Sequence, residues 1–246
     1  MPSSRLALTF ALAAALAAQG RPSTVHAAAT PTTRCDLLFA QGRVVDGTGA
    51  PWFRADVCVV GDHIAAVGHL GDIAAKRRID ATKLVIAPGF IDMMGQSEYR
   101  LLVDNRGASK ITQGITTEIT GEGGSIAPLN ARMLAAGAST YQHYGYTPTF
   151  TTIGGYFDVL KKRGSALNVG TFVGAGGVRN FVMGEGDRAP NAAELEAMKA
   201  AVTQAMKDGA LGLSTSLIYV PDHFASTEEI IALAKVAASF GGSYIT

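Results

Sequence analysis

The sequence has little net charge, and its basic residues do not gather in one place. Lysine and arginine number 21 against 20 aspartates and glutamates in 246 residues, and no basic cluster exceeds the triplet at 76–78. Proteins that bind nucleic acid through its phosphates carry a basic patch or stripe. The composition therefore gives no electrostatic reason to expect a nucleic-acid partner, and we interpret the triplet as a solvated loop or strand edge.

Cysteine is scarce, with only Cys35 and Cys58 in the chain. Their spacing is not that of a zinc site. Because Cys58 lies in the apolar run 57–60, we expect it to behave as a small buried hydrophobic residue. A disulfide between the two is the less favoured alternative: export would permit it, but the sequence does not supply the geometry that a bridge requires.

Long apolar runs are also lacking, apart from one at the N-terminus. Arg5 precedes a continuous apolar stretch at 6–18, and small-residue cleavage sites follow near Ala18 or at 27–29. This run is too short to span a bilayer comfortably and is typical of a signal peptide. We therefore exclude residues 1–30 from the fold and expect export to the periplasm or the medium, with no membrane association after cleavage. An apolar N-terminal helix of a cytosolic protein is the less favoured alternative.

Short strand patterns separated by Gly-Asp turns fill residues 34–88. Strands are predicted at 36–45, 55–60, 63–68, 79–81 and 84–87. Such spacing predicts a small antiparallel β-sandwich domain. His63 and His69 fall within it, so we interpret both as structural or surface residues.

From residue 89 to 246 the patterns of strand and helix alternate. The first strand is the end of the apolar run at 84–92, and further strands are predicted at 115–120, 167–173, 209–214 and 243–246. Helices are predicted at 106–113, 129–144, 155–163, 191–208 and 226–240. The helix at 191–208 has the clearest start, because Asn191 and Glu194 form a capping-box pattern. Alternation implies a parallel sheet with right-handed crossovers. The predicted fold class is α/β: an incomplete (β/α)8 TIM barrel with about strands 1–5, preceded by the β-sandwich.

The stretch 84–98 lies where the predicted β-sandwich ends and the segments with candidate functional residues begin. Its apolar run passes a Pro-Gly break, ends at Asp92, and continues into polar residues. A buried strand that is polar only where it emerges is expected to open into a site at its carboxyl end. We interpret Asp92 as positioning a neighbouring strand or backbone, and the glycine runs at 121–124 and 174–177 as giving the backbone room to turn.

This stretch resembles the first barrel strand of the amidohydrolase superfamily, specifically the N-acyl-D-amino-acid deacylase branch, in which Pro-Gly-Phe-Ile-Asp precedes a His-x-His metal motif. Other segments are similar to the same branch: Gly-Arg-Val-Val-Asp-Gly-Thr-Gly at 42–49, Gly-Ile-Thr-Thr at 114–117 and Gly-Leu-Ser-Thr-Ser-Leu-Ile-Tyr-Val-Pro at 212–221. The resemblance covers the chain from about residue 35 to its end. It also implies that such enzymes are roughly twice as long, so we expect this chain to be an N-terminal fragment.

The resemblance implies a hydrolase in which zinc activates a water molecule for attack on an amide. Met94 and Gln96 occupy the two histidine positions, and a thioether and an amide are poor zinc ligands. The family's cysteine ligand aligns with either Gly123 or Glu122. Because a zinc site needs three or more protein ligands and only Glu122 could bind metal, we name Glu122 as the candidate ligand, although an ordinary loop acid is the alternative. One zinc ion is expected, with its remaining ligands beyond residue 246.

Candidate substrate-binding residues follow the predicted strands. Tyr219 is expected to donate to a substrate carbonyl or carboxylate, or else to pack within its loop. Gln96 and Glu98 either line the pocket or solvate their loop. His143 and His223 are isolated in sequence, and we interpret both as surface residues.

Two hypotheses remain for the function. The first is an exported, metal-dependent amidohydrolase whose full-length form acts on a small-molecule amide, an N-acyl-D-amino acid or a similar C–N bond other than a peptide bond. On this hypothesis the chain alone is expected to be inactive, because much of the ligand set and the barrel closure are absent. The second is a non-catalytic binding protein that retains the amidohydrolase fold. The sequence does not predict the oligomeric state.

Overall fold

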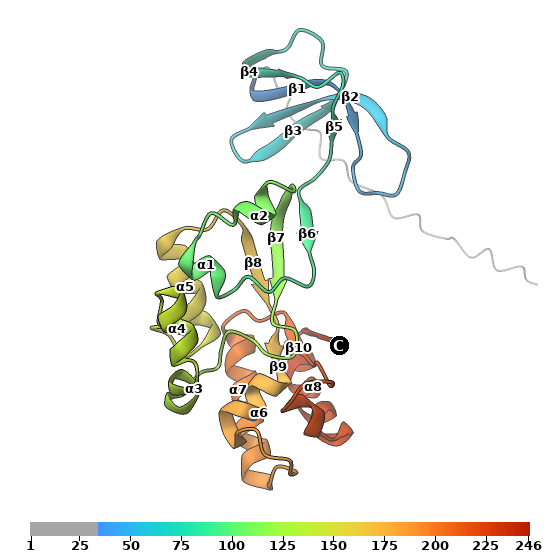
Figure 1. Ribbon diagram of the computed structural model, residues 1–246. Coiled ribbons are helices and arrows are strands. Elements are labelled where there is room, and N and C mark those ends of the chain that lie inside the picture. The colour runs from blue at the N-terminus through green and yellow to red at the C-terminus, as the bar shows by residue number, and fades with distance from the viewer. Residues whose placement is uncertain (1–33) are drawn as a thin grey trace, which may run out of the picture. The chain divides into compact units, whose positions relative to one another are not determined.

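A computed structural model of the protein describes residues 34–246. The expected signal peptide at 1–30 lies outside the described residues. The chain divides into two compact units, with the boundary between Ala87 and Pro88 (Figure 1). We call them the β unit and the α/β unit, and each is described by itself.

The β unit is one five-stranded sheet. Its strands are β1 (Arg34–Val44), β2 (Phe53–Val60), β3 (His63–Gly68), β4 (Ala74–Asp80) and β5 (Val85–Ile86). The order is β3-β2-β1-β4, and β5 also pairs with β1. The contacts of β2 with β1 and β3 are antiparallel as expected, but β4 and β5 run parallel to β1. The expected antiparallel sandwich is therefore a mixed sheet, because the chain leaves the hairpins and returns on the far side of β1.

The core of the β unit corrects the expectation for the cysteines. Cys35, Leu38 and Cys58 are fully buried, as expected for small hydrophobic residues. The two cysteines are nevertheless joined by a disulfide, with their Cα atoms 5.5 Å apart. That separation falls within the range that a bridge requires. Strand pairing brings together these two residues, which are 23 positions apart, and such a pairing does not follow from the spacing of the cysteines alone.

The α/β unit contains two short parallel sheets. The strands are β6 (Phe90–Asp92), β7 (Ile115–Thr120), β8 (Asn168–Thr171), β9 (Val173–Gly174), β10 (Gly212–Ser214) and β11 (Ser243–Ile245), paired as β6-β7-β8 and β9-β10-β11. Only Phe172 separates β8 from β9, and its N–H donates to the carbonyl of Thr120 at 2.9 Å. One continuous stretch of chain therefore belongs to both sheets. The strands of residues 88–246 form no closed barrel.

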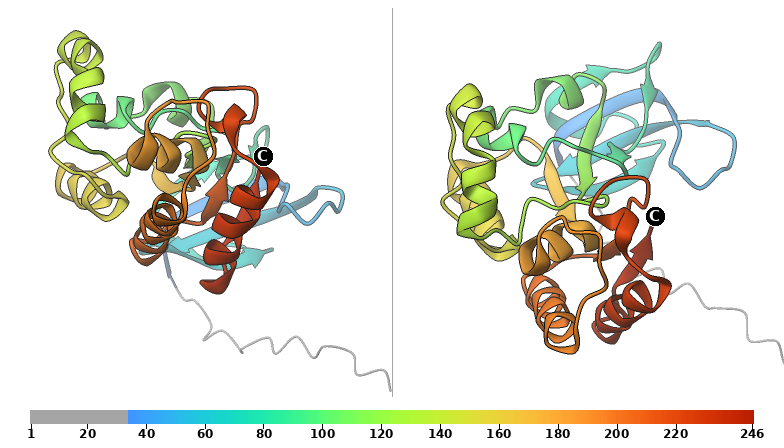
Figure 2. Two further views of the ribbon diagram at one scale, coloured as in Figure 1. Left: turned by 90° about the horizontal axis from the view of Figure 1, so that it is seen from below. Right: turned by 60° about the horizontal axis from the view of Figure 1, so that its bottom comes forward.

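Helices follow the strands, as the alternation predicted (Figures 1 and 2). They are α1 (Arg100–Val103), α2 (Ala108–Ile111), α3 (Ala131–Ala136), α4 (Ala138–Tyr144), α5 (Ile153–Arg163), α6 (Ala175–Met183), α7 (Ala192–Lys207), the 3₁₀ turn η1 (Asp222–Phe224) and α8 (Thr227–Ser239). The capping box of α7 is present: Asn191 Oδ1 accepts from the Glu194 N–H at 2.9 Å, and the Glu194 carboxylate accepts from the Asn191 N–H at 2.8 Å. No helix within the described part of the chain is long and apolar enough to cross a membrane.

Apolar packing fixes the strand ends of the α/β unit in place. One cluster joins β9 and β10 to α6, α7 and α8 and includes Val173, Val178, Met198, Leu213 and Leu233, all fully buried. A second cluster joins α1 to α5 and the segment before β8 through buried residues such as Leu102, Tyr156 and Leu167. Each large aliphatic side chain buried in this way contributes about 1.5–3 kcal/mol. The loops that leave the strands therefore start from rigid positions.

Candidate functional site

A pocket of about 450 Å³ lies where several strands of the α/β unit end. We call it the strand-end pocket. It is lined by Gln96, Glu122, Gly123, Gly124, Ser125, Met133, Gly176, Gly177, Asn180, Glu185, Ser216, Tyr219, Val220, Pro221 and Asp222. These residues come from the segments that follow β6, β7, β9 and β10. The carboxyl ends of parallel strands are the usual place for ligands in α/β proteins, and this volume suits a small molecule.

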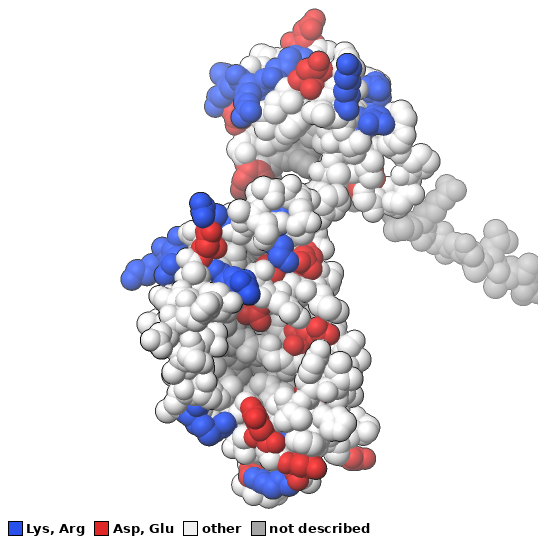
Figure 3. All heavy atoms as spheres, in the orientation of Figure 1, with Lys and Arg blue, Asp and Glu red and all other residues white. Residues whose placement is uncertain are grey.

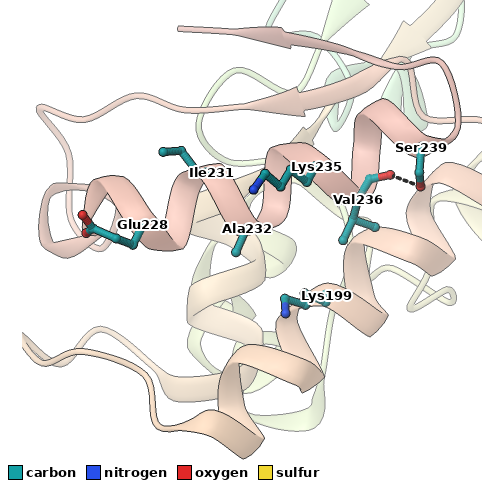
Figure 4. A pocket seen from close by; sticks show the side chains of 7 residues that line it. All are labelled: Lys199, Glu228, Ile231, Ala232, Lys235, Val236 and Ser239. Carbon is teal, nitrogen blue, oxygen red and sulfur yellow. Dashed lines mark hydrogen bonds between the residues drawn. The ribbon is translucent and has the colours of Figure 1, made fainter.

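Two other hollows of about 610 Å³ each are less suited to chemistry. One is a groove between α7 and α8 whose side chains all come from those two helices (Figure 4). Its Lys199 is already paired with Glu196 at 2.7 Å. The other lies at the amino ends of β8 and β10, beside Asn168 and Leu211. Neither hollow is lined by the loops that directly follow the carboxyl ends of the strands.

The strand-end pocket brings together three of the four site residues named from the sequence. Gln96, Glu122 and Tyr219 all line it. Tyr219 is largely exposed, with 64% of its residue surface accessible, so its hydroxyl can reach a ligand. Glu98 does not line this pocket and is half-buried behind β6.

The loop that carries Glu122 is tied to the neighbouring strand segments. The Gly123 N–H donates to Ser214 Oγ at 3.2 Å, and that hydroxyl donates to the carbonyl of Gly121. The Gly174 N–H donates to Ser125 Oγ at 3.1 Å. Gly123 has φ +66°, and a Cβ there would lie 2.4 Å from the Cβ of Ser216. Glycine is therefore required at 123 by both conformation and space.

Asp222 closes the side of the pocket formed after β10. Its residue surface is only 3% exposed. Oδ2 accepts from the Ser216 N–H at 2.7 Å, whereas Oδ1 is buried and has no hydrogen-bond partner. Burial, together with the nearby charge of Glu229, raises the pKa of Asp222 to about 6. Gly176 makes room for it, since a Cβ at 176 would lie 2.9 Å from the carboxyl carbon.

The first turn of α6 corrects the sequence analysis. The glycines at 174–177 were expected to form a turning loop, but α6 begins at Ala175, with Gly174 as its N-cap residue. Its glycines lie against Asp222 and the loop at 123–125. The helix forms there because Val178 and Arg179 are buried, and tertiary packing overrides the low helix propensity of glycine.

A buried ion pair lies close to Asp222. Arg179 Nη1 donates to Glu229 Oε2 at 2.6 Å, and the two side chains are 0% and 3% exposed. The other terminal nitrogen of Arg179 donates to the carbonyls of Gly186 and Arg188. Arg179 is therefore engaged by α8 and the segment after α6, and it does not line the strand-end pocket.

Beside the end of β6, one lysine lies among three acidic side chains. We call this set, Asp92, Glu98, Lys110 and Glu118, the β6-end cluster; its buried oxygens Glu98 Oε2 and Glu118 Oε2 have no hydrogen-bond partner. Lys110 Nζ donates to Asp92 Oδ2 and lies 3.5 Å from Glu118 Oε1, which also accepts from the Ser97 N–H at 3.0 Å. The pairing with Lys110 lowers the pKa of Asp92. Burial, and then the charge of Glu118, raises the pKa of Glu98 to about 7.

The residues present do not make a complete zinc site. Within residues 34–246, no three histidine, cysteine, aspartate or glutamate residues converge in a way that would hold a metal ion. Met94 is 64% exposed, and Gln96 offers only an amide. Glu122 is a possible ligand, but zinc needs three or four close donors. The expected zinc ion does not fit the described residues alone, so no chemical step is assigned to it.

Sequence reasoning missed Asn180, Glu185 and Asp222. Asp222 directly follows the 212–221 segment that carried the resemblance, but nothing in the sequence indicates that its carboxyl is buried. Asn180 lies on α6, which was not predicted. His143 and His223 are exposed, as expected for surface histidines.

Comparisons with known proteins give closely related sequences. No family model matches the chain. The chain is 40% identical over 212 residues to D-aminoacylase of Alcaligenes xylosoxydans xylosoxydans, which covers 86% of this chain and 44% of that protein. It is 37% identical over 212 residues to N-acyl-D-glutamate deacylase of the same organism, and the match covers 85% of this chain and 42% of that protein. The chain thus spans less than half the length of these relatives.

Solved structures give the same result. A D-aminoacylase structure described for its binuclear metal centre superposes with a TM-score of 0.78 at 38% identity, covering 85% of this chain and 44% of that one. N-acyl-D-glutamate deacylase from Bordetella bronchiseptica, complexed with zinc and a phosphonate inhibitor, gives a TM-score of 0.76 at 36% identity. The superposition covers 86% of this chain and 44% of that one. L-hydantoinase from Arthrobacter aurescens superposes with a TM-score of 0.52 at 20% identity, covering 86% of this chain and 40% of that one. This likeness shows a shared fold alone.

Proposed function

The chain belongs to the family of D-aminoacylase and the N-acyl-D-amino-acid deacylases, and on that premise we propose that it is part of a hydrolase that cleaves the amide bond of N-acyl-D-amino acids. The observation that carries the proposal is the 40% identity to D-aminoacylase over 212 residues. The convergence of Gln96, Glu122 and Tyr219 on one pocket supports it. We also propose that the α/β unit is the first half of a (β/α)8 barrel.

The proposed roles follow from the chemistry of each side chain. Tyr219 donates a hydrogen bond to the carbonyl or carboxylate of the substrate, where negative charge is present or develops. Gln96 binds a polar group of the same substrate through its amide. Glu98 remains a prediction as a substrate-binding residue, because its carboxyl faces the β6-end cluster. Zinc bound with Glu122 also remains a prediction, and it requires ligands other than those described.

Export is part of the proposal. The apolar segment at 6–18 has the pattern of a signal peptide. The disulfide between Cys35 and Cys58 supports export, because disulfides persist in oxidising compartments such as the periplasm. Cell fractionation, with the N-terminal residue of the processed protein identified by mass spectrometry, tests this. Full-length protein with an intact residue 1, found in the cytoplasm, would contradict it.

Hydrolysis is tested by the release of free amine from N-acetyl-D-methionine and its L enantiomer. The assay uses the 246-residue chain and the complete open reading frame that contains it, each with and without added zinc. We expect hydrolysis of the D enantiomer by the complete protein. Tyr219→Phe lowers kcat/KM about 10–100-fold, as expected for a lost donor to charge that develops in the transition state, whereas His223→Ala leaves it unchanged. If neither polypeptide hydrolyses the substrate at any zinc concentration, the proposed deacylase activity is refuted.

A second candidate is a binding protein that retains the fold without catalysis. It is favoured by one observation: Met94 and Gln96 stand where the related branch has metal-binding histidines. Metal content separates the two candidates. Zinc that is retained by the complete protein and lost in Glu122→Ala supports the hydrolase, whereas ligand binding without turnover or metal supports the binding protein.

A further inference from the structure

We propose that the strand-end pocket binds a positively charged hydrogen-bond donor, a primary ammonium or guanidinium group, through Asp222 and Asn180. The proposal names the substrate class and in that respect rests on the proposed function. In a deacylase the bound group is the side chain of a basic N-acyl-D-amino acid. Its physical basis is a set of acceptor atoms that the protein itself leaves unsatisfied.

Two buried oxygen atoms among the lining residues have no partner. They are Asp222 Oδ1 and Asn180 Oδ1. Nearly all buried polar atoms in native proteins form a hydrogen bond, and an unpaired one costs about 1–3 kcal/mol. Glu98 Oε2 and Glu118 Oε2 also lack a partner, but their residues do not line this pocket. The two acceptors whose residues do line it indicate a group that the ligand supplies.

The second polar atom of each side chain already has a hydrogen-bond partner, which shows that the unpartnered atom is an acceptor in both residues. Asp222 Oδ2 already accepts from the Ser216 N–H at 2.7 Å, and Asn180 Nδ2 donates to Glu185 Oε1 at 3.2 Å. Rotating the Asn180 amide by 180° would place its oxygen against the Glu185 carboxylate, which is unfavourable. Both free positions are thus acceptors, and both require a donor from outside.

The charge around the pocket selects the kind of donor. Its ionisable carboxyl groups are Glu122, Glu185 and Asp222, and no lysine or arginine is among the described residues that line it. Charged groups of both signs are scattered over the face of the molecule shown in Figure 3. Outside the lining residues, the Arg132 guanidinium donates to the backbone carbonyl of Asn180. A hollow lined by carboxylates attracts a cationic group of a ligand.

Arg179 offsets this excess only in part. Its charge favours the ionised form of Asp222, but its terminal nitrogens donate to Glu229 and to backbone carbonyls and not to the pocket. The N-terminal end of α6 lies beside Asp222 and favours its ionised form, while burial opposes that form. A bound ammonium or guanidinium group would add a charge-assisted hydrogen bond to the carboxylate. An ammonium carries three N–H donors, so it can donate to Asp222 Oδ1 and still have donors for other acceptors of the pocket.

The test is isothermal titration calorimetry of the 246-residue chain at pH 7.5. N-acetyl-D-lysine is compared with N-acetyl-D-norleucine, which has a similar length and no side-chain charge. We expect the lysine derivative to bind at least about 10-fold more tightly, because a charge-assisted hydrogen bond to a buried carboxylate is lost in norleucine. Asp222→Asn should abolish this preference. Glu228→Gln, which changes an acid on α8 outside the pocket, should leave it intact.

Asn180→Ala gives a second test that leaves Asp222 unchanged, with an expected loss of about 3–10-fold in the affinity for the lysine derivative. Equal binding of the two derivatives, or a preference that survives in Asp222→Asn, would overturn the proposal. A further titration uses zinc chloride or magnesium chloride alone in place of the lysine derivative. If a metal ion binds in an Asp222-dependent manner and the lysine derivative does not, the pocket is a metal site and the proposal is wrong.

The outcome can be separated from that of the proposed function. Asp222-dependent binding of n-butylamine or N-acetyl-D-lysine without any hydrolysis by the complete protein supports the cation pocket and refutes the deacylase. Hydrolysis of N-acetyl-D-methionine with no preference for the lysine derivative supports the deacylase and refutes the cation pocket.

Discussion

The β6-end cluster and the strand-end pocket are both built from acidic side chains beside the ends of parallel strands, yet they differ in what lies beside those acids. In the cluster, Lys110 pairs with Asp92 and lies near Glu118 Oε1, and the buried oxygens Glu98 Oε2 and Glu118 Oε2 have no partner but belong to residues that do not line the pocket. In the pocket, the unpartnered oxygens of Asp222 and Asn180 belong to lining residues, and no cation of the described lining pairs with them. The difference teaches that an acidic strand end is not in itself a site.

What distinguishes a site is therefore an unpartnered acceptor whose residue lines a pocket. Acids that pair with a cation inside the protein contribute to stability, and a ligand cannot reach an unpartnered oxygen that no pocket adjoins. Acids whose oxygens are left open beside a hollow weaken the folded state slightly and gain their partner on binding. Mutations that remove internal partners should thus change stability most, and mutations around the open acceptors should change it least.

The largest effect is expected for Glu229→Ala. It leaves the Arg179 guanidinium buried without its carboxylate, and breaking a buried ion pair in this way typically costs about 3–5 kcal/mol. Urea denaturation of the α/β unit within the whole chain measures it. Glu196→Ala removes the acid of a largely exposed pair with Lys199 and should cost no more than about 0.5 kcal/mol. Equal losses in the two variants would contradict the distinction.

Lys110→Met should come next. The substitution leaves Asp92 and Glu118 without their shared cation, and Glu118 is fully buried. We expect a loss of about 2–4 kcal/mol, with most of it due to the unpaired carboxylates. Lys235→Met, on an exposed position of α8, is the matched control. If the cluster were solvated like an ordinary surface network, Lys110→Met would behave like the control.

A smaller and pH-dependent effect is expected for Glu98→Gln. The pKa of Glu98 is raised from 4.5 to about 7 in the folded protein, so the folded state binds the proton more tightly than the unfolded state. The stability that this provides is complete below about pH 4.5 and is lost as the pH rises through 7.

Glu98→Gln removes the penalty on the charged carboxylate. It should stabilise the protein by roughly 1–3 kcal/mol at pH 8 and have little effect at pH 4. Urea denaturation at the two pH values measures the difference. A change of the same size at both would show that Glu98 acts through packing and not through its proton.

The architecture was largely predictable because periodicity and caps are local. The strand at 115–120 and the helices led by Asn191 and Ser226 lie where the patterns placed them, and each cap forms the expected hydrogen bond. Two features depended on packing between distant segments and were not predictable. These are the parallel return of β4 and β5 beside β1, and the helix that begins at Ala175 within a glycine run.

The site was predictable only in part. Gln96, Glu122 and Tyr219 were found because each follows a strand pattern, and strand ends converge. Asp222 and Asn180 could not be found in this way. Their importance depends on burial and on atoms that lack a partner, and both properties arise only when α6, η1 and the loop after β7 pack together.

The smallest effects test whether Asp222 is rigidly held beside α6. A Cβ at Gly177 would meet Ser125 at 3.5 Å or more, an ordinary contact, whereas a Cβ at Gly176 would lie 2.9–3.2 Å from the carboxyl group of Asp222. Gly177→Ala should therefore stabilise the protein by about 0.5 kcal/mol through helix propensity. Gly176→Ala should be less stable than Gly177→Ala by about 1 kcal/mol, because the carboxyl must move.

The crowding at Gly176 can be assigned to Asp222 by a double-mutant cycle. In an Asp222→Ala background the clash is gone, so Gly176→Ala and Gly177→Ala should become equally stable. Thermal denaturation of the wild type and the five variants gives the coupling free energy between positions 176 and 222. A coupling near zero would mean that the carboxyl already moves freely; its free oxygen would then find water, and the contrast between the pocket and the β6-end cluster would disappear.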